Sequence, residues 1–353
     1  QDIELQLLFC GVCHSDVHQA RNDWKNTIFP CVPGHEVVGR VAKIGVDVKN
    51  FKVGDIAAVG CMIDSCGSCY SCSHGEEQYC ESPTGFLGTY NGTMNPKGQN
   101  SYGGYSNKLV VKEHFLLKVP EGMPAEVAGP ILCAGVTTYS PLKHWGIGAG
   151  MKIGIVGFGG LGHMATQIAN AMGADVTVIT TSPEKKADAI SMGASDVIVS
   201  TDADKMKEAV NSFQFILSTI PYEHDISPYV DLLERDGVLV FVGVLVPQPG
   251  WDPTKIIMHR RSLAGSLIGS VAETQEVLDF CNTHKVFPKI QKIDAKDINE
   301  AFENVFNKKA RYRYVIDLSS LAKEKVENLK EIKSVGHLIE KQTPIGEEER
   351  PLQ

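Results

Sequence analysis

The chain has 353 residues, 43% of them hydrophobic and 22% charged, a composition typical of a globular protein and one that excludes disorder over most of its length. With 34 basic and 42 acidic residues its formal net charge is −8, which argues against nucleic acid or an anionic membrane as a partner. We expect no transmembrane helix because no run of about 18 apolar residues exists, and we expect a cytoplasmic protein because the first residues lack a basic signal-peptide region.

The first ~120 residues predict short strands joined by turns. Segments 5–9, 37–44 and 107–119 are rich in Val, Leu, Ile and Phe, and Gly, Pro, Asn and Ser fill the connections between them. The pattern changes near residue 134, so we predict two units. One comprises 1–133 and 267–353, and the other comprises 134–266.

Potential metal ligands are scattered through the first unit. Cys13 and the residues after it crowd together in CGVCHSDVH, His35 and Glu36 follow in PGHEVVG, and Cys133 stands far away in LCAG. One His and two distant Cys residues form a set typical of catalytic zinc, with the fourth position open or filled by a carboxylate. The residues alone do not select Cys13 over Cys10, Cys31 or Cys61. We expect these three, and Cys281, to be core residues.

A second group of cysteines is compact. Cys66, Cys69, Cys72 and Cys80 have the spacing C-x2-C-x2-C-x7-C in a Gly- and Ser-rich loop. This spacing indicates a closed structural zinc site rather than disulfides. Free thiols and an iron–sulfur cluster are the alternatives, but the fourth cysteine of ferredoxins is typically followed by proline, and here Glu81 follows it.

From residue 152 onward, predicted strands and helices alternate, which indicates a doubly wound parallel sheet. The predicted strands are 152–156, 175–180, 196–200, 213–220 and 238–244, and the predicted helices are 161–172, 183–193, 204–211 and 229–236. After this region, 273–310 contains two helical segments, one on either side of the strand-like KIQKI.

A glycine-rich turn joins the first of these strands to its helix. Gly157, Gly159 and Gly162 form G-x-G-x-x-G, with Gly160 and Leu161 between them. The strand–turn–helix context indicates a dinucleotide site in which the backbone approaches the pyrophosphate. A turn needed only for packing is the alternative.

The end of the next strand predicts which cofactor is bound. NAD-binding proteins carry an acidic residue there, whereas this chain has Thr180, Thr181 and Ser182, with Lys185 soon after. Hydroxyls and a lysine suit the 2′-phosphate of NADP. These residues also suit a simple helix start, with Ser182 as the N-cap before Pro183 and the lysines in solvent, and the two interpretations are compatible.

Together these motifs resemble the zinc-dependent medium-chain alcohol dehydrogenases, and most of all their cinnamyl-alcohol-dehydrogenase-like branch of NADP-dependent aldehyde reductases. The resemblance runs from about residue 2 to Leu318 and rests on CGVCHSD, PGHEVVG, the four cysteines, LCAGVTTYSPLKHW, GFGGLGHMA and RYRYVID. It implies an α/β fold in which a Rossmann-type domain accompanies a mainly β, GroES-like catalytic domain.

The resemblance also implies roles for single residues. Cys13, His35 and Cys133 would bind the catalytic zinc, with Glu36 beside the metal and able to ligate it. Asp16 would hold the zinc-binding histidine. The remaining implied roles are proton transfer from the substrate oxygen through Ser15, its continuation through His18, and a pyrophosphate contact by His14.

The implied activity is reversible reduction of aldehydes to primary alcohols by NADPH, with two zinc ions per chain. The alternatives are a non-catalytic zinc- and nucleotide-binding relative and a zinc-free-type quinone reductase. The only partner we expect is a small-molecule aldehyde or alcohol, in a homodimer or a monomer. Gly88 lies near a place where plant relatives carry a large aromatic residue, so we expect a broader aldehyde range, with Trp24 lining the pocket.

The two ends of the sequence differ from the family pattern. The family has about thirty residues before CGVCHSD, and here the tail segment IKSVGHLIEKQTPIG resembles such an N-terminus. We therefore predict a circular permutation in which 319–331 bridges the old ends and 332–353 forms the displaced first strands. These strands are expected to pair near Leu5–Phe9. A truncated start with an unrelated tail is the alternative.

Overall fold

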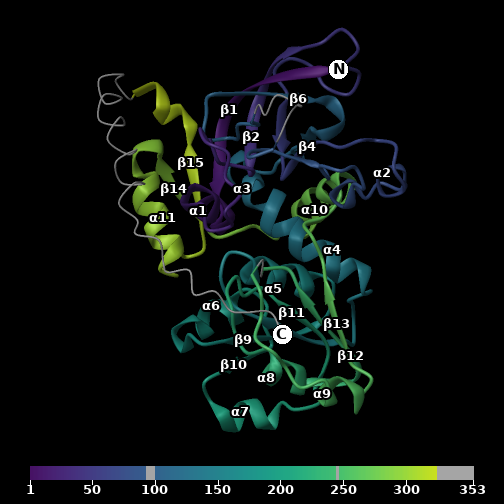
Figure 1. The fold of residues 1–353 in the computed structure, drawn as a ribbon. Coiled ribbons are helices and arrows are strands. Elements are labelled where there is room, and N and C mark those ends of the chain that lie inside the picture. The colour runs from purple at the N-terminus through teal and green to yellow at the C-terminus, as the bar shows by residue number, and fades with distance from the viewer. Residues whose placement is uncertain (93–99, 244–245, 324–353) are drawn as a thin grey trace, which may run out of the picture.

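The computed structural model describes residues 1–92, 100–243 and 246–323. Two sheets lie at opposite ends of the molecule, and helices α3, α4 and α10 lie between them (Figure 1). We call the part built on the first sheet the β-rich half and the part built on the second the Rossmann half.

The sheet of the β-rich half has seven strands in the order β14-β15-β1-β2-β3-β7, with β6 also paired to β1. Its strands are β1 (Asp2–Val12), β2 (Val37–Ile44), β3 (Ile56–Val59), β6 (Lys108–Lys112), β7 (Leu117–Lys118), β14 (Ile290–Asp294) and β15 (Arg313–Asp317). All pairs except β14 with β15 are antiparallel. A separate two-stranded sheet joins β4 (Met62–Asp64) to β5 (Leu87–Gly88).

Strand β1 is paired along both of its edges. Strand β2 covers one edge, while the other is shared by β6 at Asp2–Gln6 and by β15 at Phe9–Val12. The predicted partner of this strand, the tail 332–353, lies outside the described residues, as does most of the predicted bridge 319–331. The circular permutation therefore remains a prediction.

The second sheet is parallel throughout, in the order β10-β9-β8-β11-β12-β13. Its strands are β8 (Lys152–Val156), β9 (Asp175–Thr180), β10 (Asp196–Val199), β11 (Phe213–Ser218), β12 (Leu233–Phe241) and β13 (Ser262–Gly265). Helices α5 (Gly162–Ala171), α6 (Lys186–Ser191), α7 (Ala203–Glu208), α8 (Ser227–Asp231) and α9 (Thr254–Ile257) connect or flank them. The predicted doubly wound sheet is confirmed.

One predicted helix of this half is wrong in its extent. We expected 229–236 to be helical, but α8 ends at Asp231 and β12 begins at Leu233. Leu233 is fully buried and pairs with Phe213 across the parallel ladder. The sheet pairing outweighs the local helical pattern because burial of Leu233 depends on a partner strand that the local sequence does not contain.

The remaining helical elements are short or join the two halves. They are α1 (His14–Arg21), α2 (Tyr70–Ser73), η1 (Glu77–Tyr79), η2 (Glu113–Phe115), α3 (Ala125–Pro130), the π-helical turn η3 (Ile131–Gly135), α4 (Val136–His144), η4 (Pro183–Lys185), α10 (Val271–His284), η5 (Ala295–Asp297), α11 (Ile298–Phe306) and η6 (Leu318–Lys323). The largest buried cluster includes Leu132, Ile155 and Val277, so it runs continuously from one half into the other.

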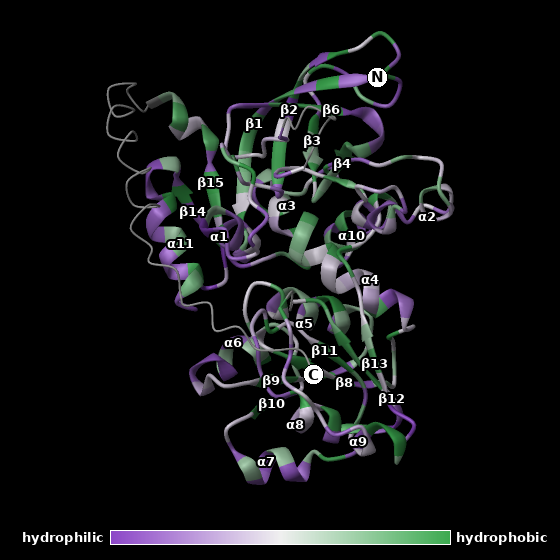
Figure 2. Ribbon diagram, viewed as in Figure 1, coloured by the Kyte–Doolittle hydropathy of each residue, from purple (hydrophilic) through white to green (hydrophobic). Residues whose placement is uncertain are grey.

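Hydropathy follows this layering. The strands of both sheets are largely hydrophobic, whereas the outer helices α6, α7 and α11 carry hydrophilic segments (Figure 2). Over the described residues, no helix has the length and apolar character needed to cross a membrane. The predicted boundaries 134 and 266 remain a prediction, although the parallel sheet spans Lys152 to Gly265.

Candidate active site and metal centres

Three separate segments bring four potential metal ligands together. Cys13 follows β1 at the N-cap of α1, His35 and Glu36 immediately precede β2, and Cys133 lies in the π-helical turn η3. All four side chains are buried, and their ligand atoms lie within 4.8 Å of one another. The sulfur atoms of Cys13 and Cys133 are 3.8 Å apart.

The chemistry of this group fits zinc. Two thiols, an imidazole and a carboxylate are all zinc donors, and a hydrogen bond from Cys133 lowers the pKa of the Cys13 thiol. The Oε2 atom of Glu36 is buried and has no hydrogen-bond partner within the described part of the chain. An added Cβ at Gly11 would overlap this oxygen, so Gly11 leaves the space that the carboxylate occupies.

Asp16 organises the same group from behind. Its fully buried carboxylate accepts hydrogen bonds from the backbone N–H of Cys13 at 2.8 Å, from the backbone N–H of Gly34 at 3.1 Å and from the hydroxyl of Tyr105 at 2.9 Å. It also lies 3.2 Å from Nδ1 of His35. Burial opposes charge on His35, but Asp16 raises the pKa of this imidazole above its ordinary value. A carboxylate on Nδ1 leaves Nε2 as the metal-binding atom.

Arg313 is a site residue for which the sequence analysis predicted no role. Its Nη1 atom donates to Oε1 of Glu36 at 3.0 Å and to the carbonyl of Val12 at 3.3 Å. Burial raises the pKa of Glu36 to about 7, and Arg313 works in the opposite direction. The Nε and Nη2 atoms of Arg313 have no partner among the described residues, and an added Cβ at Gly160 would lie 2.6 Å from Nε. Arg313 therefore lies between the four potential metal ligands and the glycine-rich turn.

The residues expected to transfer protons lie on α1. The Ser15 hydroxyl is 3.7 Å from the sulfur of Cys13, and Nδ1 of His18 is 2.7 Å from Oδ2 of Asp23. His14 stacks on His18 with ring centroids 4.5 Å apart, and burial lowers the pKa of His14 to about 4. Within the described part of the chain, no hydrogen bond joins the side chains of Ser15 and His18 to each other. Asp23 was not predicted, because nothing local marks it as the partner of His18.

The glycine-rich turn forms the opposite wall of the site. Gly157 has φ +91°, a conformation that favours glycine, and an added Cβ at Gly162 would overlap the carbonyl of Gly157. Gly159, by contrast, has no atom within 4 Å of an added Cβ. Gly157 and Gly162 are therefore required by the backbone of the turn, whereas Gly159 leaves open space beside it.

One cavity connects these groups. It reaches from Cys13, Ser15, His18 and Cys133 past the turn to Thr181, Ser182 and Lys185, and Trp24 and Arg313 also line it. Leu161 and His14 lie on its wall as well, whereas Gly88 is paired in β5 and is not among the residues that line it. The expected placement of Trp24 is thus observed. Its ring centroid is 5.4 Å from that of His18.

The far end of the cavity lacks an acidic residue at the tip of β9. Lys185 donates to the carbonyl of Phe158 at 3.0 Å, and the backbone N–H of Ser182 donates to the hydroxyl of Thr180 at 3.2 Å. Glu184 is exposed and lies 3.7 Å from Nη2 of Arg311. This end therefore presents hydroxyls and a lysine to a ligand.

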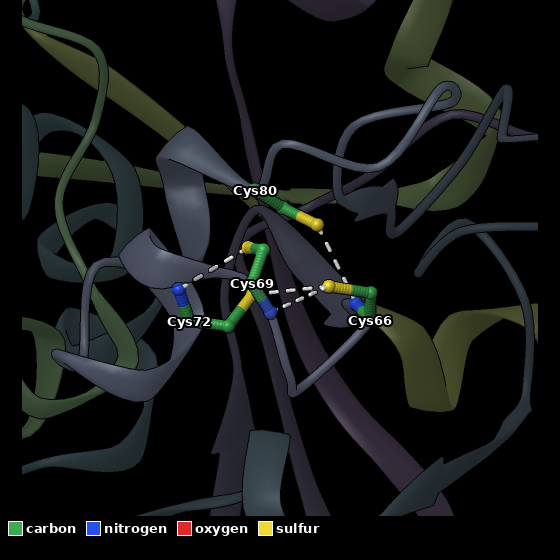
Figure 3. Close-up of side chains that lie close together, drawn as sticks. All are labelled: Cys66, Cys69, Cys72 and Cys80. Atoms are coloured by element: carbon green, nitrogen blue, oxygen red, sulfur yellow. Dashed lines mark hydrogen bonds between the residues drawn. The ribbon is translucent and has the colours of Figure 1, made fainter.

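The four clustered cysteines form a separate group in a loop of the β-rich half (Figure 3). Backbone N–H groups of Cys69 and Cys72 point at the sulfurs of Cys66 and Cys69, at 3.4 and 3.5 Å. Backbone N–H groups of Ser68 and Cys69 lower the pKa of Cys66 to about 6. All ten cysteines of the chain are free, and these four ligand atoms lie within 4.8 Å of one another, which suits four thiolates around one zinc.

Cys61 differs from the simple core residue that we expected. It is half-buried, lies against the carbonyl of Leu132, and shares a hydrogen bond with Cys133 that lowers the pKa of the Cys61 thiol. Cys10 and Cys281 are fully buried, as expected.

Comparison with known proteins agrees with this geometry. Residues 1–121 match the alcohol dehydrogenase GroES-like domain, and residues 160–283 match the zinc-binding dehydrogenase domain. Aldehyde reductase YahK from Escherichia coli is 46% identical over 323 residues, covering 91% of each chain. NADP-dependent alcohol dehydrogenase C 1 from Mycolicibacterium smegmatis is 45% identical over 321 residues, again covering 91% of each.

Solved structures of the same type superpose closely. A cinnamyl alcohol dehydrogenase from Sorghum bicolor has a TM-score of 0.87 at 42% identity, covering 90% of each chain. A cinnamyl alcohol dehydrogenase from Helicobacter pylori, complexed with NADP(H), has a TM-score of 0.84 at 40% identity and the same coverage. The predicted pairing of a Rossmann-type domain with a GroES-like domain is confirmed, and the chain belongs to the zinc-binding alcohol dehydrogenase family, among its aldehyde reductases and cinnamyl alcohol dehydrogenases.

Proposed function

We propose that the protein reversibly reduces aldehydes to primary alcohols with NADPH and holds two zinc ions per chain. The observation that carries this proposal is the convergence of Cys13, His35, Glu36 and Cys133 on one another, with Cys13 and Cys133 lining the same cavity as the glycine-rich turn. Relatives named aldehyde reductase and NADP-dependent alcohol dehydrogenase support it.

Cys13, His35 and Cys133 would hold the catalytic zinc, with Glu36 beside it. When bound, the zinc supplies Lewis acidity and NADPH supplies the reducing equivalents. Asp16 keeps Nδ1 of His35 occupied, which fixes the imidazole for binding through Nε2. Arg313 limits where the Glu36 carboxylate can move by holding its Oε1 atom.

The protein's own contribution to proton transfer lies on α1. Ser15 lies beside Cys13 on the cavity wall, so its hydroxyl is suited to exchange a proton with a substrate oxygen. His18 stands one helical turn away, next to Asp23, which orients its imidazole from Nδ1. A hydroxyl of the bound cofactor ribose or a water would complete the path between Ser15 and His18.

The cofactor would extend along the rest of the cavity. Gly157, Gly159, Gly160, Leu161 and Gly162 present the turn to the pyrophosphate, and His14 lies on the same cavity wall. The two unpartnered nitrogens of Arg313 also suit an anion.

The 2′-phosphate would bind to Thr181, Ser182 and Lys185 at the far end of the cavity. Substitution Lys185→Ala should raise the KM for NADPH about tenfold or more and leave the KM for NADH nearly unchanged, because a charge-assisted contact is worth about 1.5–3 kcal/mol. Steady-state kinetics with both cofactors measure this. Equal use of NADPH and NADH by the parent protein would contradict the cofactor assignment.

The second zinc would be structural and held by Cys66, Cys69, Cys72 and Cys80. These residues do not line the cavity, so a metal held by them would not contact the substrate. The four thiols offer a complete tetrahedral set, which is typical of structural rather than catalytic zinc.

One assay separates this proposal from its alternatives. Oxidation of NADPH is followed with benzaldehyde, before and after treatment with a chelator. We expect turnover that the chelator abolishes. A non-catalytic relative would show no turnover at any zinc content, and a zinc-free-type quinone reductase would keep its activity after chelation.

We also propose a homodimer in a reducing, cytoplasmic compartment. Strand β13 is an edge of the parallel sheet, and the nearby side chains of Ile257 and Met258 are 73% and 76% exposed. An exposed strand edge beside apolar side chains favours pairing with a second copy. Ten free cysteines suit a reducing compartment. Light scattering of the parent and of Ile257→Lys tests the dimer, which the lysine should weaken.

A further inference from the structure

A lysine of the β-rich half reaches across to the Rossmann half at the mouth of the cavity. Lys308 lies in the loop between α11 and β15. Its Nζ atom donates to the hydroxyl of Tyr222 at 2.8 Å and lies 4.0 Å from the centroid of that ring. Tyr222 follows β11, and both residues line the cofactor cavity.

Lys308 belongs to a group of three cations around this end of the cavity, together with Lys185 and Arg311. Burial lowers the pKa of Lys185, and the charges of Arg311 and Lys308 lower it further, so both cations lie close enough to Lys185 to repel its charge. Arg311 lies 3.7 Å from Glu184. Lys185 and Lys308 have only neutral acceptors, a carbonyl and a phenol, in the part of the chain that the structure describes.

Such an arrangement favours an anion. Two lysines that have no carboxylate partner among the described residues reach this cavity from opposite halves, and Thr181 and Ser182 also line it. A phosphate accepts charge-assisted hydrogen bonds that are about twice as strong as a bond to a neutral hydroxyl. Lysine suits the exchange of one partner for another because its ammonium is carried on a long flexible stem.

We propose that Lys308 is a specificity residue for the phosphorylated cofactor. Its ammonium group leaves the Tyr222 hydroxyl and binds the adenosine 2′-phosphate opposite Lys185. This inference rests on the proposed NADP(H) dependence and extends it. The phosphate is then held by both halves of the molecule at once, so recognition of NADPH also joins the two halves across the cavity. NADH lacks the phosphate and leaves Lys308 on Tyr222.

Equilibrium binding tests the proposal without turnover. Nicotinamide fluorescence gives Kd for NADPH and NADH, and calorimetry gives Kd for 2′,5′-ADP and 5′-AMP, with the parent protein, Lys308→Met and the control Lys309→Met. Lys309 is exposed and does not line the cavity. We expect Lys308→Met to weaken NADPH and 2′,5′-ADP about tenfold and to leave NADH and 5′-AMP within twofold, and Lys309→Met to change none of them.

Unchanged NADPH affinity in Lys308→Met would overturn the proposal. So would an equal loss for NADPH and NADH, which would assign Lys308 to cofactor binding in general rather than to the phosphate. Tyr222→Phe adds a check, because removing the hydroxyl that competes for Lys308 should leave NADPH affinity equal or higher. A loss in Tyr222→Phe as large as in Lys308→Met would also count against it.

The controls separate this inference from the proposed function. A parent protein that binds NADPH and NADH equally would contradict the cofactor assignment itself. A parent that prefers NADPH, loses the preference in Lys185→Met and keeps it in Lys308→Met would contradict only the role of Lys308. Thermal unfolding of each variant establishes that it is folded.

Discussion

Ser15 and Asp16 are neighbours in the first turn of α1, but their environments give them different chemistry. Ser15 lines the cavity, whereas Asp16 is fully buried and accepts hydrogen bonds from two backbone N–H groups and a tyrosine hydroxyl. A hydroxyl at the cavity wall can exchange protons with a ligand, and a buried carboxylate can only fix its neighbours. At the scale of single residues, exposure to the cavity therefore separates the two proposed roles.

Substitution Ser15→Ala should lower kcat about 10²- to 10⁴-fold, the range typical of a lost proton-transfer group. The Kd for NADPH and the zinc content should stay close to those of the parent, because Ser15 is not among the metal-binding group. Steady-state kinetics and fluorescence titration measure these quantities. Ser15→Thr is the matched control, since it keeps the hydroxyl and should keep most of the activity. A fully active Ser15→Ala protein would exclude this residue from the proton path.

Short elements, rather than single side chains, shape the turn and the cysteine loop. The turn after β8 works through backbone geometry, with Gly157 at φ +91° and Gly162 packed against its carbonyl. The cysteine loop instead folds its own backbone N–H groups onto its sulfurs. Each element carries its conformation in its local sequence.

The glycines of the turn should respond differently to one added methyl group. Gly162→Ala should destabilise the protein by about 1–3 kcal/mol, because the new Cβ would overlap a backbone carbonyl. Gly159→Ala should leave the free energy of unfolding nearly unchanged and weaken NADPH binding, because its Cβ meets no atom within 4 Å and occupies the open space above the turn. Urea unfolding and fluorescence titration separate the two effects. Equal destabilisation by both substitutions would contradict this division.

The two cysteine groups should also differ when one ligand is removed. Cys69→Ser should cost folding stability, because a closed structural zinc contributes directly to folding. Cys133→Ser should leave the protein folded and abolish turnover. Metal analysis should find two zinc ions in the parent and fewer in each variant, with circular dichroism to follow unfolding. A parent with a single zinc, and an active Cys133→Ser protein, would show that the dispersed group is not a catalytic metal site.

At the scale of the whole molecule, the two halves meet through rings and charges as well as through the cavity. His163 on α5 stacks on Tyr312, which precedes β15, with ring centroids 5.2 Å apart. Burial lowers the pKa of His163 to about 3, and the nearby charge of Arg313 lowers it further. The histidine is therefore uncharged where the Rossmann half packs against the β-rich half.

This histidine should make the free energy of unfolding fall in acid. Because the pKa is depressed on folding, the stabilisation is complete above the unfolded value of about 6.5 and is lost as the pH falls toward 3. Between pH 7.5 and pH 5 the parent should lose about 2 kcal/mol more than His163→Gln, whose side chain does not titrate. Urea unfolding at both pH values, at one fixed zinc concentration, measures the difference. Identical losses would show that His163 does not carry the effect.

The sequence by itself determined whatever is encoded at short range. The spacing of Cys66, Cys69, Cys72 and Cys80 and the G-x-G-x-x-G turn define their own sites, because each loop closes on itself. Alternating strand and helix patterns from residue 152 likewise predicted the parallel sheet. The resemblance then selected Cys13, His35 and Cys133, a choice that the residues alone had left open.

Only the tertiary structure decided which distant groups meet. Arg313 reaches Glu36 because β15 pairs beside β1, and β12 begins at Leu233 because Phe213 offers it a partner strand. Lys308 likewise contacts Tyr222 only because the two halves pack against each other. Local sequence records the conformation of a loop, but a contact between residues far apart in the chain depends on how the sheets pair and pack, and no neighbouring residue encodes that.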